Sequence, residues 1–129
     1  MDQQRILLVE DDTDLRRVIC EALELMGHQV TTAVDGRDAL VKLEQGEFDV
    51  ICSDVAMPNG LSGIELAERV RVLYPGARLI LTSGYPRSEL GPLPQGTVFL
   101  TKPYRLTQLL DAIASVATEA GAGVRQRTS

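Results

Sequence analysis

The feature that most constrains the fold of this 129-residue chain is an alternation between short apolar runs and segments with helical apolar spacing. Aliphatic and β-branched residues are concentrated in five short runs, at 5–9, 29–33, 49–53, 78–81 and 98–101. Between the runs, apolar residues recur three and four positions apart, as in helices that pack one face against a sheet. Because strands that alternate with helices are joined by right-handed crossovers, the pattern predicts a doubly wound, five-stranded parallel α/β sheet with helices on both faces.

Residues at the ends of the helical segments support this interpretation. Gly27 is well placed to cap the first helix, Asp35 opens the second, and Ser62 with Glu65 has the spacing of a capping box for the third. The fourth crossover differs, since residues 84–94 contain three prolines and two glycines, and we expect its helix to be short or broken. The last helix carries an apolar stripe of Leu106, Leu109, Leu110, Ile113, Val116 and Ala117.

Composition and charge narrow the class of protein. Apolar residues make up 44% of the chain and charged residues 24%, as in ordinary globular domains, and the formal net charge is −5. This charge disfavours nucleic acid, and no apolar stretch approaches the ~20 residues of a membrane span. The N-terminus enters the first run without an export-type leader. We therefore expect one cytoplasmic domain over residues 1–121, with no direct membrane contact, and a flexible tail at 122–129.

The cysteines and the single histidine offer little chemistry. Cys52 lies within an apolar run and Cys20 on the inward face of the first helix, and neither has the spacing of a redox or metal pair, so we interpret both as small buried thiols. His28 begins the second run, away from the carboxyl ends of the strands. A histidine-based metal site or a Ser-His-Asp triad therefore has no candidate.

Polar residues follow four of the five runs, at the point where each run ends. In an open parallel sheet the carboxyl ends of the strands line one crevice, so these residues are expected to converge. They are Glu10 and Asp11 after the first run, Asp54 after the third, Thr82 and Ser83 after the fourth, and Lys102 after the fifth. Such a set can hold a divalent cation and a phosphoryl group together.

The acidic residues of this set favour a bound cation. Carboxylates about 4 Å apart repel by ~4 kcal/mol at an effective dielectric near 20, and a divalent cation relieves that repulsion. Oxygen ligands with room for water suit Mg²⁺, with Mn²⁺ as an alternative, better than zinc. A simpler explanation is that acidic residues after a strand cap the next helix, as Asp12, Thr13 or Asp14 could here. For Glu10 and Asp11 alone the two explanations weigh about equally, and the combination with Asp54 and Lys102 favours the functional one.

Four motifs of the chain resemble the signature of receiver domains of two-component response regulators. The resemblance spans residues 5–118, in the order and spacing of the family, and implies the flavodoxin-like strand order 2-1-3-4-5. The motifs are Val9-Glu10-Asp11-Asp12, Ser53-Asp54-Val55-Ala56-Met57-Pro58, Leu81-Thr82-Ser83-Gly84 and Thr101-Lys102-Pro103-Tyr104.

The resemblance implies a role for each matching residue. Asp54 matches the aspartate that accepts a phosphoryl group from a kinase histidine. Asp11, Asp54 and the backbone carbonyl of Ala56 match the direct Mg²⁺ ligands, and Glu10 matches the acidic residue that reaches the metal through water. The matches to the phosphoryl-binding and switching residues are the hydroxyl of Thr82, its small neighbour Ser83, the cation Lys102 and the reorienting aromatic Phe99.

The resemblance also implies a signalling module rather than an enzyme, limited to Mg²⁺-dependent self-phosphorylation and slow autodephosphorylation. Its implied partner is a histidine kinase or histidine phosphotransfer protein, and a weak homodimer is left open. The Lys102–Pro103 bond is expected to be cis, because aiming the lysine over the crevice needs a sharp turn. Two features depart from the commonest form of the family: the loop between Pro58 and Gly63 is one residue longer, and prolines break the fourth helix. The proline-rich crossover resembles that of stand-alone receivers and of receivers attached to hybrid sensor kinases.

Two other classes of protein share parts of this pattern. A flavodoxin-like flavin protein has the same sheet, but it needs a Ser/Thr/Gly-rich phosphate loop where this chain has acidic residues. A phosphatase with an aspartate nucleophile places Asp-x-Asp after the first strand, and Asp12-Thr13-Asp14 matches formally. Asp14, however, is expected inside the first helix, and the chain has no second cap domain.

Overall fold

A computed structural model describes residues 3–57 and 60–115 of the chain. Val116 and Ala117 of the expected apolar stripe, and the expected tail at 122–129, lie outside the described residues. The strands are β1 (Arg5–Val9), β2 (Gln29–Ala33), β3 (Val50–Asp54), β4 (Arg78–Ser83) and β5 (Val98–Thr101). The helices are α1 (Thr13–Leu25), α2 (Gly36–Gln45) and α3 (Gly63–Leu73), with a 3-10 turn η1 (Arg87–Glu89) and a last helical stretch at 106–115.

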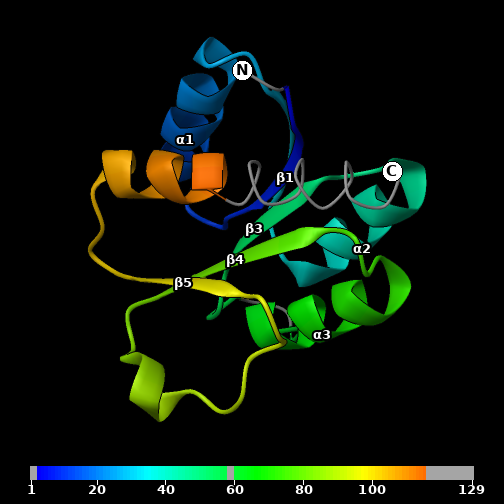
Figure 1. The fold of residues 1–129 in the computed structure, drawn as a ribbon, viewed down its shortest axis with the longest axis vertical. Helices are drawn as coiled ribbons and strands as arrows, with labels where there is room; N and C mark the ends of the chain where they lie inside the picture. Colours follow the sequence, from blue (N-terminus) through cyan, green and yellow to red (C-terminus); the bar gives the residue numbers. More distant parts are fainter. Residues whose placement is uncertain (1–2, 58–59, 116–129) are drawn as a thin grey trace, which may run out of the picture.

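The five strands form one parallel sheet in the order β2-β1-β3-β4-β5, which confirms the predicted fold class. The chain runs outward from β1 to β2, returns to β3 and continues to β5 at the opposite edge (Figure 1). The strand order therefore reverses between β1 and β3, and this reversal opens a crevice at their carboxyl ends.

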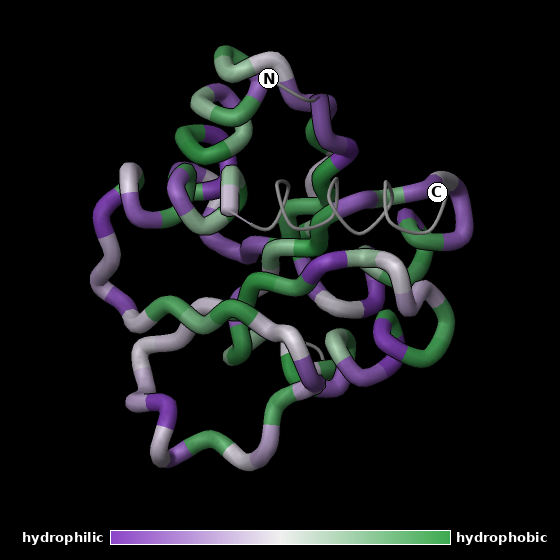
Figure 2. Tube along the Cα trace, in the orientation of Figure 1, coloured by the Kyte–Doolittle hydropathy of each residue, from purple (hydrophilic) through white to green (hydrophobic). Residues whose placement is uncertain are grey.

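Apolar side chains fill both faces of the sheet. One core cluster packs alternate residues of β1, β3 and β4 against α2 and α3, and the other packs the intervening residues against α1 and the 106–115 helix (Figure 1). Leu7 and Ile6, neighbours in β1, belong to opposite clusters and are both fully buried. Figure 2 shows the hydrophobic residues concentrated along the strands, as expected for a parallel sheet covered on both sides.

The helix ends follow the signals expected from the sequence. The Asp12 side chain caps α1 by accepting a hydrogen bond from the Leu15 N–H at 3.0 Å, and Asp35 caps α2. The capping box of Ser62 and Glu65 is present in both directions at the start of α3. These caps fix where each helix begins relative to the strand that precedes it.

Two strands end closer to the crevice than the sequence predicted. β3 covers Val50–Asp54 rather than 49–53, and β4 continues to Ser83, two residues past its apolar run. Ladder bonds account for this, since the carbonyl of Thr82 accepts from the Val55 N–H at 2.8 Å and that of Ser83 from the Lys102 N–H at 2.7 Å. Backbone pairing therefore extends through the polar residues of the candidate site.

The fourth crossover has no α-helix within the described residues. Between β4 and β5 the chain makes only the three-residue turn η1 and otherwise extends away from the sheet as a loop (Figure 1). Leu90 and Leu93 pack back against the core on the α3 side, while residues 84–89 are exposed. The expectation of a short or broken fourth helix is confirmed.

The loop from β3 to α3 is fixed at its far end by a glycine. Pro58 and Asn59 lie outside the described residues, but Gly63 is buried and its N–H donates to the Val55 carbonyl at 2.8 Å. A Cβ atom at Gly63 would overlap the carbonyl of Asp54. The start of α3 is thus packed directly against the backbone of Asp54.

The two cysteines differ in burial, and His28 lies before β2, away from the carboxyl ends of the strands. Cys52 is fully buried in β3, and burial raises the pKa of its thiol to about 12. Cys20 is only half-buried, at the margin of the core cluster on the α1 side. His28 is buried before β2, where its Nδ1 accepts a hydrogen bond from the Gln4 N–H at 3.1 Å.

In the described part of the chain, no helix combines the length and apolar character needed to cross a bilayer.

Candidate functional site

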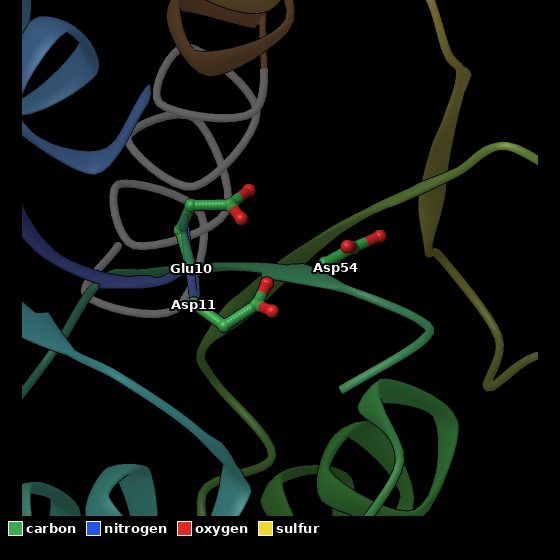
Figure 3. A group of neighbouring side chains, drawn as sticks. All are labelled: Glu10, Asp11 and Asp54. Atoms are coloured by element: carbon green, nitrogen blue, oxygen red, sulfur yellow. The ribbon is translucent and has the colours of Figure 1, made fainter. Parts of the chain in front are cut away.

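Three carboxylates meet where β1 and β3 end. Oxygen atoms of Glu10, Asp11 and Asp54 lie within 4.8 Å of one another, and Figure 3 shows the first two extending from the end of β1 toward Asp54. Glu10 and Asp54 are 3% and 8% exposed, whereas Asp11 faces solvent. The site therefore combines two buried acids with one that is open to water and ions.

Glu10 is held at both its backbone and its side chain. Its N–H donates to the Ala33 carbonyl at 3.0 Å, and its Oε2 accepts from the Asp12 N–H at 3.0 Å. Burial raises the pKa of Glu10, while the bond from the Asp12 N–H and the charge of Lys102 act in the opposite direction. The carboxylate of Glu10 is thus a fixed, partly engaged group rather than a freely rotating one.

Asp54 is paired with Lys102. The Nζ of Lys102 donates to Oδ2 of Asp54 at 3.0 Å and lies 3.8 Å from Oε1 of Glu10. Burial alone would lower the pKa of Lys102, but the hydrogen bond and charge of Asp54, with the other two acids, raise it overall. The peptide bond between Lys102 and Pro103 is cis, as expected.

Two hydroxyl residues complete the crevice on the β4 side. Thr82 stands opposite Asp54 in the register of β3 and β4 and is 2% exposed. Ser83 is fully buried, and its Oγ accepts from the Tyr85 N–H at 2.9 Å. Both hydroxyl residues therefore end a strand that borders the carboxylates.

The other expected site residues lie around this group. Ala56 follows Asp54 by two residues and is exposed in the loop after β3. Phe99, in β5, is half-buried and packs against the core cluster on the α3 side. The structure thus places the carboxylates, the hydroxyl residues and Lys102 at the carboxyl ends of the strands, Ala56 in the loop after β3 and Phe99 within β5.

The residues present fit a divalent cation. Among the described residues, Lys102 forms ion pairs with Glu10 and Asp54, so the three carboxylates in their ionised form leave an excess of negative charge, and Asp11 offers exposed oxygen atoms beside two buried acids. Oxygen ligands with access to water are what Mg²⁺ and Mn²⁺ require, because both keep part of their hydration shell.

Sequence reasoning missed two residues beside the site. The guanidinium of Arg16, in α1, donates from Nη1 to the Glu10 carbonyl at 2.8 Å. Tyr104 is half-buried against the core cluster on the α1 side, where burial raises the pKa of its phenol and the charges of Glu10 and Asp54 add to the effect. Position gave a signal for Arg16, since a helical side chain points toward the N-terminus and so reaches back to the preceding turn.

Residues 6–114 match the family described as the response regulator receiver domain. This chain is a receiver domain of that family. The carboxylates at the end of its sheet are the acidic site of a receiver, and as a receiver the chain is a signalling module rather than an enzyme. Asp14, which the phosphatase alternative needs, lies in α1 and pairs with Arg17 at 3.4 Å.

The receiver is similar to both free-standing and fused relatives. It is 35% identical to the response regulator receiver protein CpdR of Brucella abortus over 113 residues, covering 85% of this chain and 93% of CpdR. It is 34% identical to the sensor kinase CckA of the same organism, covering 84% of this chain and 12% of CckA. The structure of the response regulator TrrA of Thermotoga maritima, in complex with Mg²⁺-BeF, has a TM-score of 0.78 at 30% identity and covers 88% of this chain and 99% of TrrA.

Proposed function

We propose that this receiver accepts a phosphoryl group on Asp54 from a histidine kinase or a histidine phosphotransfer protein, with Mg²⁺ bound beside it. The observation that carries the proposal is the position of Asp54, a buried carboxylate flanked by two further acids and hydrogen-bonded to Lys102. The TrrA complex with Mg²⁺-BeF supports the choice of Mg²⁺, and Mn²⁺ offers the same ligand chemistry.

The site residues divide the chemistry between them. A carboxylate oxygen of Asp54 attacks phosphorus, the phosphorus–nitrogen bond to the donor histidine breaks, and the electron pair of that bond leaves with the imidazole. A cation held by Asp11, Asp54 and the Ala56 carbonyl, with Glu10 acting through water, would offset charge on the phosphoryl oxygens. Lys102 would exchange its bond to Asp54 for one to a phosphoryl oxygen.

In this proposal, residues of β4 and β5 change conformation when Asp54 is phosphorylated. The Thr82 hydroxyl would move toward a phosphoryl oxygen, with Ser83 leaving room for it, and Phe99 would reorient as Thr82 leaves its resting position. Phe99 is half-buried and can change rotamer more readily than a fully buried aromatic residue. The surface altered in this way includes the loop that replaces a fourth helix.

The proposal also covers the partner, the cellular location and the domain bounds of the receiver. Its negative charge and the kinase-linked relatives support a cytoplasmic protein partner and no direct contact with nucleic acid. We assign the receiver to residues 1–121 and treat 122–129 as a separate tail. A weak homodimer is compatible with this arrangement.

Phosphorylation of the purified chain tests the proposal. Incubation with acetyl phosphate and Mg²⁺ should add one phosphoryl group, detected by intact mass, and removal of the cation by chelation should prevent it. Asp54→Asn should abolish the addition, whereas Asp14→Asn, an exposed acid paired with Arg17, should leave it unchanged. Undiminished labelling of Asp54→Asn would reject the assignment.

A further inference from the structure

Arg16 makes a hydrogen bond that the family-based roles do not include. It lies in the first turns of α1, and its Nη1 donates to the backbone carbonyl of Glu10 at 2.8 Å. The bond spans six residues and joins the helix to the last residue before the β1–α1 turn. Because the Glu10 residue is 3% exposed, leaving this carbonyl without a partner would be costly.

The carbonyl that Arg16 contacts belongs to the peptide plane between Glu10 and Asp11. A peptide unit is planar, so fixing the direction of the Glu10 carbonyl also fixes the direction in which the chain enters Asp11. The other side of Glu10 is already set by the bond from its N–H to the Ala33 carbonyl. Together the two bonds fix the backbone from which the Asp11 side chain extends toward Asp54.

Asp11 depends on this backbone support more than the other two acids do. Its side chain is exposed, whereas the buried carboxylates of Glu10 and Asp54 both form ion pairs with Lys102. In the described part of the chain, the ion pairs of Lys102 do not extend to Asp11. The position of Asp11 therefore depends on its interaction with the neighbouring Glu10 side chain and on the turn that Arg16 holds.

We infer that Arg16 is a positioning residue for the cation site: through the Glu10 carbonyl it holds Asp11 in the orientation that brings its carboxylate beside Asp54. The inference rests on the proposed function for the cation and its role, and it goes further by assigning part of the cation affinity to a basic residue in α1. Arg16 touches neither the cation nor the phosphoryl group in this account.

Direct titration with Mn²⁺, followed through the electron paramagnetic resonance signal of the free ion, tests the inference without phosphorylation. Arg16→Met should weaken Mn²⁺ binding roughly tenfold, the lower end of what loss of a group supporting a metal ligand costs. Arg16→Lys should recover most of the affinity, because an ammonium can donate to the same carbonyl. Arg17→Met, which removes an exposed neighbour paired with Asp14, should bind Mn²⁺ like the parent.

Thermal unfolding of the same variants separates positioning from general stability. If Arg16→Met lowers the melting temperature while keeping the Mn²⁺ affinity of Arg17→Met, Arg16 only joins α1 to β1 and the inference is wrong. If Arg16→Met does not fold, the Mn²⁺ affinity of Arg16→Gln is compared with that of Arg17→Met instead. An equal affinity of the two variants would again show that the inference is wrong.

Phosphorylation by acetyl phosphate shows which proposal fails. For Arg16→Met we expect a slower rate at low Mg²⁺ and a rate near that of the parent at saturating Mg²⁺. If the parent chain neither binds Mn²⁺ nor becomes phosphorylated, both the proposed function and this inference are wrong. If the parent does both and the Arg16→Met variant shows the same dependence on the cation, only the inference about Arg16 is wrong.

Discussion

Lys102 reaches across the crevice to Asp54, and the 3.0 Å hydrogen bond between them joins the end of β5 to the end of β3. The lysine side chain is 29% exposed and that of Asp54 is 10% exposed, so the pair is largely shielded from solvent. A shielded pair of this kind balances charge as well as offering a partner for a phosphoryl oxygen. Its removal should therefore affect stability and cation binding together.

Without Mg²⁺, Lys102→Met should destabilise the chain by about 1–3 kcal/mol, because the buried carboxylates of Glu10 and Asp54 lose the ammonium group that pairs with them. Saturating Mg²⁺ should recover much of that loss by supplying positive charge at the same place. Denaturant unfolding with and without Mg²⁺ measures both effects. Lys42→Met is a matched control, since Lys42 is 32% exposed and pairs with Asp38 in α2. An equal loss for Lys102→Met in both conditions would contradict this account of the pair.

The two acids after β1 should contribute unequally to cation binding. Asp11 is exposed, while Oε2 of Glu10 accepts a hydrogen bond from the Asp12 N–H and Oε1 lies near Lys102. Asp11→Asn should therefore weaken Mn²⁺ binding by about tenfold or more, and Glu10→Gln by only a few-fold. Resonance titration of free Mn²⁺ measures both, with Asp14→Asn as the control. Equal losses would contradict the unequal roles, and unchanged binding in both variants would show that the acids serve the helix start instead.

His28 should make the stability of the chain depend on pH. Burial lowers its pKa in the folded state, and its Nδ1 accepts a hydrogen bond from the Gln4 N–H that protonation would remove. The unfolded chain then binds a proton more readily, so the stabilising contribution is complete above about pH 6.5 and declines as the pH falls below it. His28→Asn keeps an acceptor without a titrating group.

Urea unfolding from pH 8 to pH 5 measures the His28 effect as the difference between parent and variant. The parent should lose more stability than His28→Asn on the acid side of pH 6.5. Because both proteins share every other titrating group, including Glu10 with its raised pKa, their contributions cancel in the difference. Parallel curves for the two proteins would show that His28 does not titrate differently on folding.

Amide hydrogen exchange should be fast in the crossover between β4 and β5. The backbone bonds within it are few: Glu89 N–H to the Pro86 carbonyl, Leu90 to Arg87 and Thr97 to Pro94. We expect exchange at 84–96 to be much faster than in the fully buried residues 79–81 of β4. Beryllofluoride with Mg²⁺, which mimics a phosphoryl group, should change the rates in this loop. Slow exchange with and without beryllofluoride would indicate a rigid segment that does not respond.

Much of the fold followed from the sequence because its signals are local. Apolar runs fixed the strands, and Asp12, Asp35 and Ser62 mark helix starts through bonds to amides only three residues away. The absence of a helix from the proline-rich segment has an equally local cause, because proline has no backbone N–H to donate. The convergence of carboxylates followed in turn from the parallel topology, which brings the strand ends to one edge.

What the sequence did not indicate depends on contacts between distant segments. The extension of β4 to Ser83 requires a partner just after β5, the Lys102 N–H, which the sequence of a polar strand end does not predict. The half-buried position of Cys20 depends on how α1 lies across the sheet. The position of Arg16 in the first turns of α1 predicts that its side chain reaches back toward the preceding turn, but its partner, the Glu10 carbonyl, depends on the course of that turn.

The contact between Gly63 and the Asp54 backbone has a consequence for variation among receivers. Since α3 begins against the Asp54 carbonyl and its first N–H is bonded to Val55, both ends of the intervening loop are fixed in space. An added residue between them should therefore extend outward, away from Asp54. Insertions and deletions there should therefore be tolerated over evolution and should alter the surface that a partner protein contacts beside the crevice, while the Asp54 carboxylate keeps its place.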